Sequence, residues 1–141
     1  MDTYTQGEYV LIAEDDTDDQ EMLMEALKEV DPGFQFRVAS SGSKAIKMFQ
    51  ALASDDLPCM IILDYNLPEL SGAEVLAKLN ELPHLKNITK VVWSTSGSPV
   101  YEKRCYELGA DYYAVKPIGL AEMKAIARKM VDLCLTKGAN E

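Results

Sequence analysis

Residues 59–64 read Cys-Met-Ile-Ile-Leu-Asp, five apolar residues in a row that end at an aspartate. A strand that is buried on both faces of a parallel sheet is apolar throughout, so residues 59–63 are predicted to form such a strand. Short runs of the same kind recur along the chain and alternate with longer amphipathic segments. The predicted strands are residues 9–13, 34–38, 59–63, 88–93 and 111–115.

The amphipathic segments between these strands are predicted helices. They are residues 18–30, a segment capped by Ser41 that carries Ala45 to Leu52, residues 71–79, 100–108 and 120–135. Strands that alternate with helices indicate an α/β fold, a doubly wound parallel sheet with helices on both faces. The 141 residues suit a single domain over 1–141, with a core of about residues 8–135 and short tails at 1–7 and 136–141.

Polar side chains follow four of the predicted strands. The residues at these points are Glu14, Asp15 and Asp16, then Asp64, then Ser94, Thr95 and Ser96, and finally Lys116. In open α/β sheets the functional crevice lies beyond the carboxyl ends of the strands. We therefore expect several carboxylates, a hydroxyl and one lysine to converge at one edge of the sheet.

A group of carboxylates with a lysine and a hydroxyl favours Mg²⁺ binding and phosphoryl transfer to an aspartate. Clustered carboxylates repel one another unless a cation joins them, and Mg²⁺ prefers oxygen ligands of this kind. A carboxylate beside Mg²⁺ can attack phosphorus and form an aspartyl phosphate. A lysine and a hydroxyl then supply further contacts to the phosphoryl oxygens.

The formal net charge is −9, which argues against nucleic acid as a direct partner. Between Glu14 and Asp31 there are nine acidic residues and one basic residue, so nearly the whole excess lies in one short segment. The charge is therefore better explained by a cation-binding site, followed by a helix whose first turn is acidic.

The sequence begins without a secretory signal, and its apolar runs are too short to span a bilayer. The three cysteines fit no metal-binding or redox spacing. These features favour a cytoplasmic protein without a membrane partner.

Four motifs resemble the receiver domains of two-component response regulators, of the stand-alone kind, over about residues 8–135. They are Val10-Leu-Ile-Ala-Glu-Asp-Asp16, Ile62-Leu-Asp-Tyr-Asn-Leu-Pro68 with Ser71-Gly72, Val91-Val-Trp-Ser-Thr95, and Gly109-Ala-Asp111 with Val115-Lys-Pro117. The resemblance implies a five-stranded (βα)5 flavodoxin-like receiver fold with strand order 2-1-3-4-5. It is somewhat closer to short regulators paired with phytochrome-like kinases.

The resemblance also implies a role for each site residue. Asp64 corresponds to the aspartate that accepts the phosphoryl group. Glu14 and Asp15 correspond to the acidic pair that, with Asp64 and the main-chain carbonyl of Asn66, holds Mg²⁺ or Mn²⁺. Whether Asp16 also contacts the metal stays open.

Further positions of the pattern contact the phosphoryl group or respond to it. Lys116 corresponds to the lysine that pairs with the phosphoryl oxygens, and the bond before Pro117 is expected to be cis. Ser94, rather than Thr95, corresponds to the switch hydroxyl, and Tyr113 to the switch aromatic residue.

Such a domain is a signalling module rather than an enzyme, beyond catalysing its own phosphorylation and dephosphorylation. The implied partners are a sensor histidine kinase or a phosphotransfer protein, together with a downstream protein. That protein would bind the face formed by residues 100–108, the fifth strand and residues 120–135. A homodimer through the last helices is compatible with the sequence.

Three alternative functions compete with this interpretation. A Mg²⁺-dependent small-molecule phosphatase or phosphotransferase with an aspartyl nucleophile would need a second aspartate where Asn66 stands. A flavin-binding module would use the hydroxyl-rich run from Ser94 to Ser98 as a phosphate cradle. A receiver-like domain that no longer takes phosphate is disfavoured by the intact set of site residues.

Overall fold

The computed structural model describes the backbone of residues 9–139 and the side chains of residues 9–135. The strands are β1 (Tyr9–Ala13), β2 (Gln35–Ala39), β3 (Met60–Asp64), β4 (Thr89–Ser94) and β5 (Tyr112–Val115). The helices are α1 (Thr17–Val30), α2 (Gly42–Ala51), α3 (Gly72–Leu79), α4 (Pro99–Glu107), α5 (Leu120–Ala139) and a short 3₁₀ helix η1 (Pro83–Leu85).

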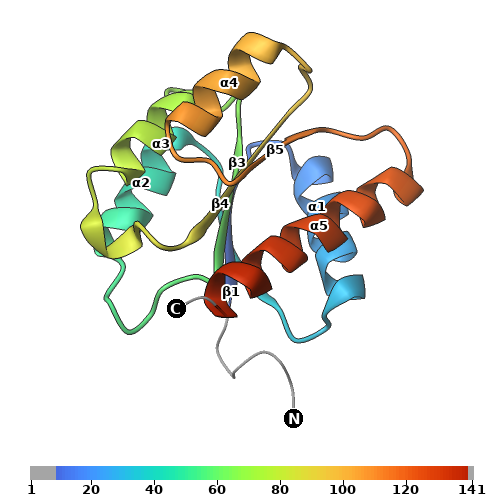
Figure 1. Ribbon diagram of the computed structural model, residues 1–141, viewed down its shortest axis with the longest axis horizontal. Coiled ribbons are helices and arrows are strands. Elements are labelled where there is room, and N and C mark those ends of the chain that lie inside the picture. The colour runs from blue at the N-terminus through green and yellow to red at the C-terminus, as the bar shows by residue number, and fades with distance from the viewer. Residues whose placement is uncertain (1–8, 140–141) are drawn as a thin grey trace.

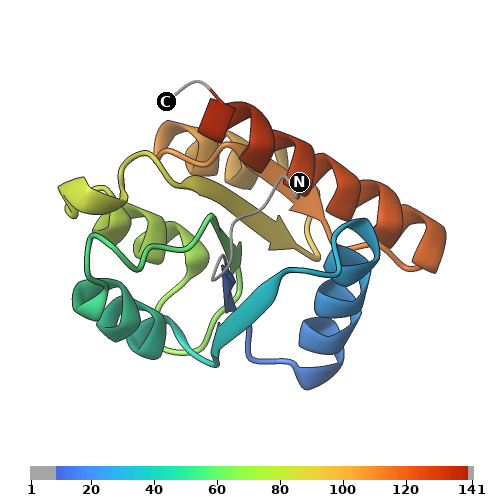
Figure 2. The same cartoon turned by 90° about the horizontal axis from the view of Figure 1, so that it is seen from below.

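All the strand pairs are parallel, and the sheet order is β2-β1-β3-β4-β5. Figure 1 shows the sheet edge-on, with α1 and α5 covering one face and α2, α3 and α4 the other. Figure 2 shows the strands between these layers, from β2 in cyan to β5 in orange. The predicted fold class and strand order are confirmed.

The core consists of two apolar layers, one on each face of the sheet. Side chains alternate along a strand, so Leu11 and Ile61 pack with α2 and α3, whereas Val10 and Ile62 pack with α1 and α5. β1 and β3 are buried along their whole length, as the apolar runs predict. β2 is mostly exposed because it lies at the edge of the sheet.

Strands β3 and β4 each run one residue further than the hydrophobic pattern predicts. Both strands end in a polar residue, but the backbone ladder continues through it: Asp64 lies opposite Trp93, and Ser94 opposite Val115. The side chains of Asp64 and Ser94 are therefore held by the sheet itself rather than by a loop.

Two helix boundaries also differ from the prediction. α1 begins at Thr17, because the side chain of Asp16 caps it by accepting the N–H of Asp19 at 2.9 Å. α5 continues to Ala139, through part of the expected tail at 136–141. The other expected tail, residues 1–7, lies outside the described residues. None of the helices described is both long and apolar enough to cross a membrane.

Gly72, the first residue of α3, lies against the backbone that follows β3. A Cβ atom there would come within 2.7 Å of the Asp64 carbonyl oxygen and 2.8 Å of the Tyr65 Cα. The Gly72 N–H also donates to the Tyr65 carbonyl at 2.8 Å. The absence of a side chain therefore allows α3 to begin directly against the end of β3.

We predict that Gly72→Ala lowers the free energy of unfolding by about 1–3 kcal/mol, because the clash is with backbone atoms that cannot move independently. Gly119→Ala is the matched control, since a Cβ at that position meets nothing within 4 Å. It should change the free energy by about 0.5 kcal/mol or less in urea denaturation. Equal effects of the two substitutions would contradict this account of Gly72.

Candidate functional site

The carboxyl ends of β1, β3, β4 and β5 bring the expected polar residues to one edge of the sheet. Glu14 follows β1, Asp64 ends β3, Ser94 ends β4 and Lys116 follows β5. Glu14 and Ser94 are fully buried, and Asp64 is nearly so. Burying an unpaired charge costs folding free energy, so these carboxylates need partners. The partners also determine how the carboxylates are oriented.

The Lys116 ammonium is the partner that these carboxylates share. Its Nζ lies 2.8 Å from Glu14 Oε1 and 3.0 Å from Asp64 Oδ2. A third carboxylate, Asp19 of α1, places its Oδ2 2.9 Å from the same Nζ. One largely buried ammonium therefore joins three carboxylates that come from different elements.

Trp93 supports this ammonium on another side. Its ring is fully buried in β4, and the Lys116 Nζ lies 4.8 Å from the ring centroid. An ammonium at this distance from an indole is attracted by the negative face of the ring. The Trp93 Nε1, by contrast, has no hydrogen-bond partner among the described residues. The contribution of Trp93 here is therefore its ring.

The prediction of a cis peptide bond before Pro117 is wrong. The described residues contain no cis peptide bond, so the Lys116–Pro117 bond is trans. Trans is the lower-energy isomer for a bond of this type. The Lys116 N–H donates to the Ser94 carbonyl at 2.7 Å, and the long side chain reaches the carboxylates from there.

Glu14, Asp15 and Asp64 form a group that could hold a metal ion. Each offers a carboxylate oxygen, and these oxygens lie within 4.8 Å of one another. Glu14 and Asp64 are buried, whereas Asp15 is exposed and lines the open side. A set made only of carboxylate oxygens suits a hard divalent cation such as Mg²⁺ or Mn²⁺ rather than a softer metal.

Asp16 belongs to α1 rather than to this group. Its carboxylate is used as the helix cap, and it lies outside the group of acids that could share an ion. Its N–H donates to Glu14 Oε2 at 3.0 Å, which fixes the Glu14 side chain. The Gln20 amide also donates to the Glu14 carbonyl, at 2.7 Å.

Asn66 holds the other side of the Asp64 carboxylate. Its N–H donates to Asp64 Oδ1 at 3.0 Å, while Asp64 Oδ2 accepts from Lys116. Each oxygen of Asp64 therefore has a different donor, and the carboxylate is held in one orientation.

The site strongly perturbs two pKa values. Burial raises the pKa of Glu14 from 4.5 to about 7, although hydrogen bonds from Lys116 and from the Asp16 N–H act in the opposite direction. Burial also acts to lower the pKa of Lys116, but its hydrogen bonds to the three carboxylates outweigh this and raise the pKa above 10.5. Lys116 therefore stays charged, and Glu14 is the group that titrates near neutral pH.

Ser94 and Tyr113 lie next to each other across β4 and β5. Tyr113 is buried, and its hydroxyl donates to the Ser96 carbonyl at 2.6 Å. Burial raises the pKa of Tyr113, and a side-chain hydrogen bond with Ser94 partly offsets the rise. Ser94 is buried whereas Thr95 is exposed, which favours Ser94 as the hydroxyl that faces the site.

A second aromatic contact connects the loop after β3 with α4. The rings of Tyr65 and Tyr101 stack with their centroids 4.6 Å apart and an angle of 12° between their planes. Tyr65 directly follows Asp64, and Tyr101 lies in the first turn of α4. A movement of the loop that begins at Tyr65 would therefore shift the first turn of α4.

Sequence reasoning missed the contacts of Asp19 and Trp93 with Lys116 and the stacking of Tyr101 on Tyr65. Asp19 was expected only to favour the positive end of α1. An available signal was its position three residues after the cap Asp16, which places it in the first turn beside the sheet edge. Trp93 and Tyr101 carry no signal in the spacing, because their roles depend on ring orientation.

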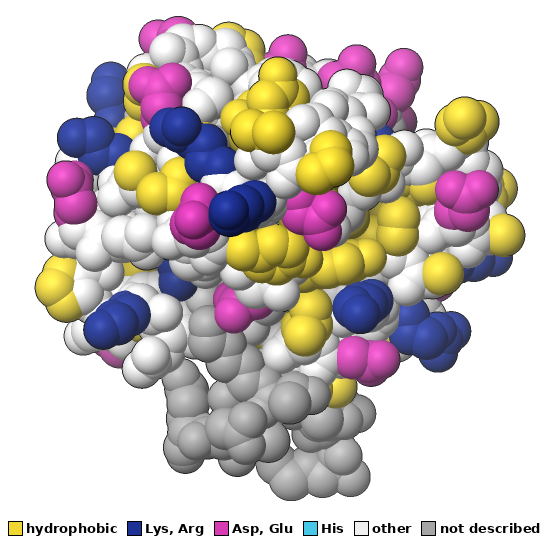
Figure 3. Space-filling model, turned by 45° about the horizontal axis from the view of Figure 1, so that its top comes forward, with side chains coloured by type: hydrophobic (Ala, Val, Ile, Leu, Met, Phe, Trp, Pro, Cys, Tyr) yellow, Lys and Arg dark blue, Asp and Glu magenta, His cyan; other side chains and the backbone are white. Residues whose placement is uncertain are grey.

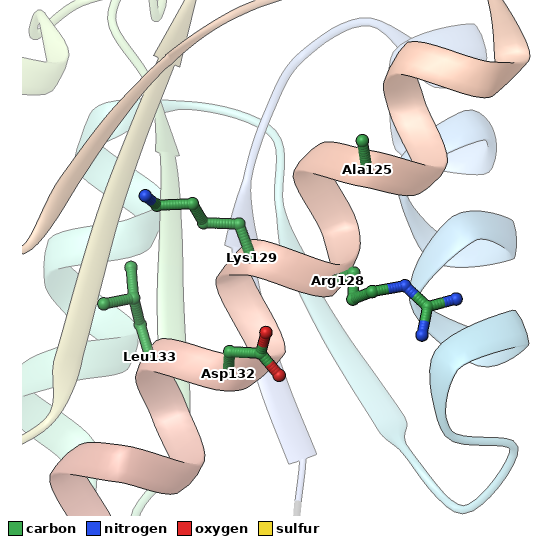
Figure 4. Close-up of a pocket in the computed structure, with 5 residues that line it drawn as sticks. All are labelled: Ala125, Arg128, Lys129, Asp132 and Leu133. Carbon is green, nitrogen blue, oxygen red and sulfur yellow. The ribbon is translucent and has the colours of Figure 1, made fainter.

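Away from the strand ends, a shallow hollow of about 450 Å³ lies along α5 (Figure 4). The described residues that line it all belong to this helix: Ala125, Arg128, Lys129, Asp132 and Leu133. Because it does not include the buried carboxylates or the residues that hold them, we assign it no role in their chemistry.

Comparisons with known proteins find similar sequences and structures over most of the chain. Residues 10–128 match the family described as the response regulator receiver domain. The chain is 30% identical to the two-component response regulator ORR11 of Oryza sativa over 123 residues, which cover 87% of this chain and 80% of ORR11. It is also 30% identical to ORR7 of the same species over 124 residues, 88% of this chain. The match spans only 57% of the length of ORR7.

Two similar solved structures are also response regulators. The Mn²⁺-bound form of response regulator Rcp1 is 28% identical with a TM-score of 0.78. The phosphorylated cyanobacterial phytochrome response regulator RcpA is 27% identical with a TM-score of 0.80. Each similarity covers 91% of this chain and 94% of the other.

The raised pKa of Glu14 predicts a pH dependence of stability in metal-free protein. Between about pH 4.5 and pH 7 the folded chain binds a proton at Glu14 that the unfolded chain has lost. The free energy of unfolding should therefore fall as the pH rises through this window, by at most about 1.4 kcal/mol per pH unit. Urea denaturation with a chelator, from about pH 5 to pH 8, measures this slope.

The control is Glu14→Gln, which cannot titrate. Its slope should be less negative than that of the wild type, because the other acidic residues contribute similarly to both proteins. Identical slopes would mean that Glu14 has an ordinary pKa.

Proposed function

The chain belongs to the response regulator receiver domain family of two-component signalling, and we propose that it accepts a phosphoryl group on Asp64 in a Mg²⁺-dependent reaction. The observation that carries this proposal is the shared Lys116 ammonium, which holds Asp64 and Glu14 at 3.0 and 2.8 Å. It places a fixed positive charge beside the oxygen expected to receive phosphorus.

Glu14, Asp15 and Asp64 are the residues that would hold the cation, with the main-chain carbonyl of Asn66 as a further ligand. The carboxylate oxygens fit Mg²⁺ or Mn²⁺, and the similar regulator Rcp1 has been solved in a Mn²⁺-bound form. When bound, the ion supplies positive charge that offsets the negative charge on the transferring phosphoryl group.

The phosphodonor would be a phosphohistidine on a sensor histidine kinase or on a phosphotransfer protein. A carboxylate oxygen of Asp64 attacks the phosphorus, the new O–P bond forms, and the N–P bond to the imidazole breaks. The imidazole leaves with the electron pair and takes a proton. Lys116 stays protonated throughout, because its raised pKa keeps it charged at neutral pH.

The new phosphoryl oxygens would attract two groups already close to Asp64. Lys116 exchanges a carboxylate partner for a phosphoryl oxygen, and the Ser94 hydroxyl turns toward another. The ring of Tyr113 is already buried in the protein and continues to fill the space beside Ser94. Phosphorylation thereby shifts the balance between two arrangements of β4, β5 and α4.

The surface that would report this shift is the α4–β5–α5 face. Figure 3 shows hydrophobic side chains gathered on this side of the molecule. The exposed hydrophobic residues from α4 to the start of α5 are Val100, Tyr101, Tyr106, Val115, Ile118 and Leu120. Apolar side chains exposed together indicate a protein partner rather than nucleic acid, and a downstream protein or a second copy of the chain would bind here.

The rival functions find no supporting observation. In the run from Ser94 to Ser98, the Ser94 and Ser96 hydroxyls accept N–H groups of the same loop, at 3.0 and 3.1 Å. These amides are therefore not directed at a flavin phosphate. For a small-molecule phosphatase, position 66 would have to carry a second aspartate, and the exposed Asn66 cannot act as a general acid.

The acceptor assignment predicts that acetyl phosphate with Mg²⁺ adds one phosphoryl group to the wild-type protein. Asp64→Asn should take up none, because the amide is not a nucleophile, and a chelator should prevent labelling of the wild type. Intact-protein mass spectrometry measures the uptake. Asp55→Asn, at an exposed loop position, is the control and should be labelled like the wild type. A labelled Asp64→Asn protein would show that the acceptor lies elsewhere.

The metal assignment predicts different effects at two neighbouring aspartates. Asp15→Asn should weaken Mg²⁺ binding about tenfold or more, because it removes a ligand. Asp16→Asn should weaken it about threefold or less, because asparagine still caps α1 and only an exposed charge is lost. Calorimetric titration with Mg²⁺ tests both variants. The opposite ranking would make Asp16 the ligand.

A further inference from the structure

Asp19 is the one carboxylate partner of Lys116, among the described residues, that lies outside the group of acids that could share a metal ion. Glu14 and Asp64 lie within the group of acids that could share an ion, and Asp19 does not. All three contact the ammonium at similar distances, between 2.8 and 3.0 Å. The ammonium and a bound cation would therefore compete for Glu14 and Asp64, whereas Asp19 would pair with the ammonium alone.

The backbone of α1 fixes the position of Asp19. Its N–H donates to the Asp16 side chain at 2.9 Å, so it is held in the first capped turn of the helix. Its side chain is 30% exposed and lies at the open rim of the site, above the buried Glu14 and Asp64. Asp19 thus offers the ammonium a carboxylate on the solvent side of the site.

We propose that Asp19 is a positioning residue that keeps Lys116 beside Asp64 while lowering the competition between Lys116 and the metal. This inference rests on the proposed function. An ammonium and a divalent cation beside the same carboxylates repel each other, because both are positively charged. A carboxylate on the ammonium alone offsets part of that repulsion, so the cation and the ammonium can flank Asp64 together.

Without Asp19, the ammonium would keep only the two carboxylates that the metal needs. Asp19→Asn should therefore raise the Kd for Mg²⁺ about fivefold, although Asp19 does not contact the ion. It should also raise the Mg²⁺ concentration that gives half-maximal labelling by acetyl phosphate. Asp19→Glu restores a carboxylate in this turn and should recover most of the affinity.

Asp18→Asn is the matched control. Asp18 lies in the same turn of α1, is exposed, and makes no ion pair within the described part of the chain. Its substitution removes the same charge at the same end of the helix and should change the Kd for Mg²⁺ about twofold or less. Urea denaturation of both variants verifies that α1 still forms.

Lys116→Met provides the second arm of the experiment. In this background no ammonium needs a partner, so Asp19→Asn should affect Mg²⁺ binding no more than Asp18→Asn does. A difference that persists in Lys116→Met would mean that Asp19 acts directly on the ion and would overturn the proposal. Equal effects of Asp19→Asn and Asp18→Asn in the wild-type background would overturn it as well.

These outcomes are distinct from a failure of the proposed function. If the wild-type protein neither binds Mg²⁺ nor takes up a phosphoryl group, the receiver activity itself is refuted. If it does both while Asp19→Asn matches Asp18→Asn, only the role of Asp19 is refuted.

Discussion

The pairing of one lysine ammonium with three carboxylates is the constraint on which the site depends. Glu14 and Asp64 are buried at the ends of β1 and β3, where an unpaired carboxylate would be strongly destabilising. Lys116 compensates both, and Asp19 and Trp93 hold its ammonium in place. The carboxylates nevertheless outnumber this cation, which leaves the edge of the sheet with an excess of negative charge. In the proposed reaction this excess attracts the divalent cation, and the cation in turn would offset the negative charge of the phosphoryl group.

The sheet order determines which residues can take part. With β1, β3, β4 and β5 side by side, the residues after these strands necessarily meet, so Glu14, Asp64, Ser94 and Lys116 could be placed from the sequence. Their convergence needed only the rule that parallel strands share one carboxyl edge. Asp64 and Ser94 are part of the ladder, and their side chains therefore have little freedom to leave the site.

Other features of the site could not be predicted from the pattern. Asp19 contacts Lys116 across 97 positions of the chain, and this requires the first turn of α1 to face the loop after β5. The ring of Trp93 lies 4.8 Å from the ammonium, and hydrophobic periodicity does not specify where a ring is directed. The sequence does not decide whether Asp16 binds the metal, whereas in the structure its carboxylate caps α1. The cis bond before Pro117 was implied by family resemblance alone, and the trans bond lets Lys116 reach the same carboxylates.

If Lys116 and a divalent cation together position Asp64 for phosphorylation, both should contact a phosphoryl group on Asp64. A crystal structure of the protein with Mg²⁺ and beryllofluoride, a mimic of the phosphoryl group, would show whether they do. We expect beryllofluoride on Asp64, the ion beside Asp15 and Asp64, and the Lys116 ammonium in contact with a fluorine atom and still paired with Asp19. An ion bound away from these carboxylates, or beryllofluoride on another residue, would contradict this expectation.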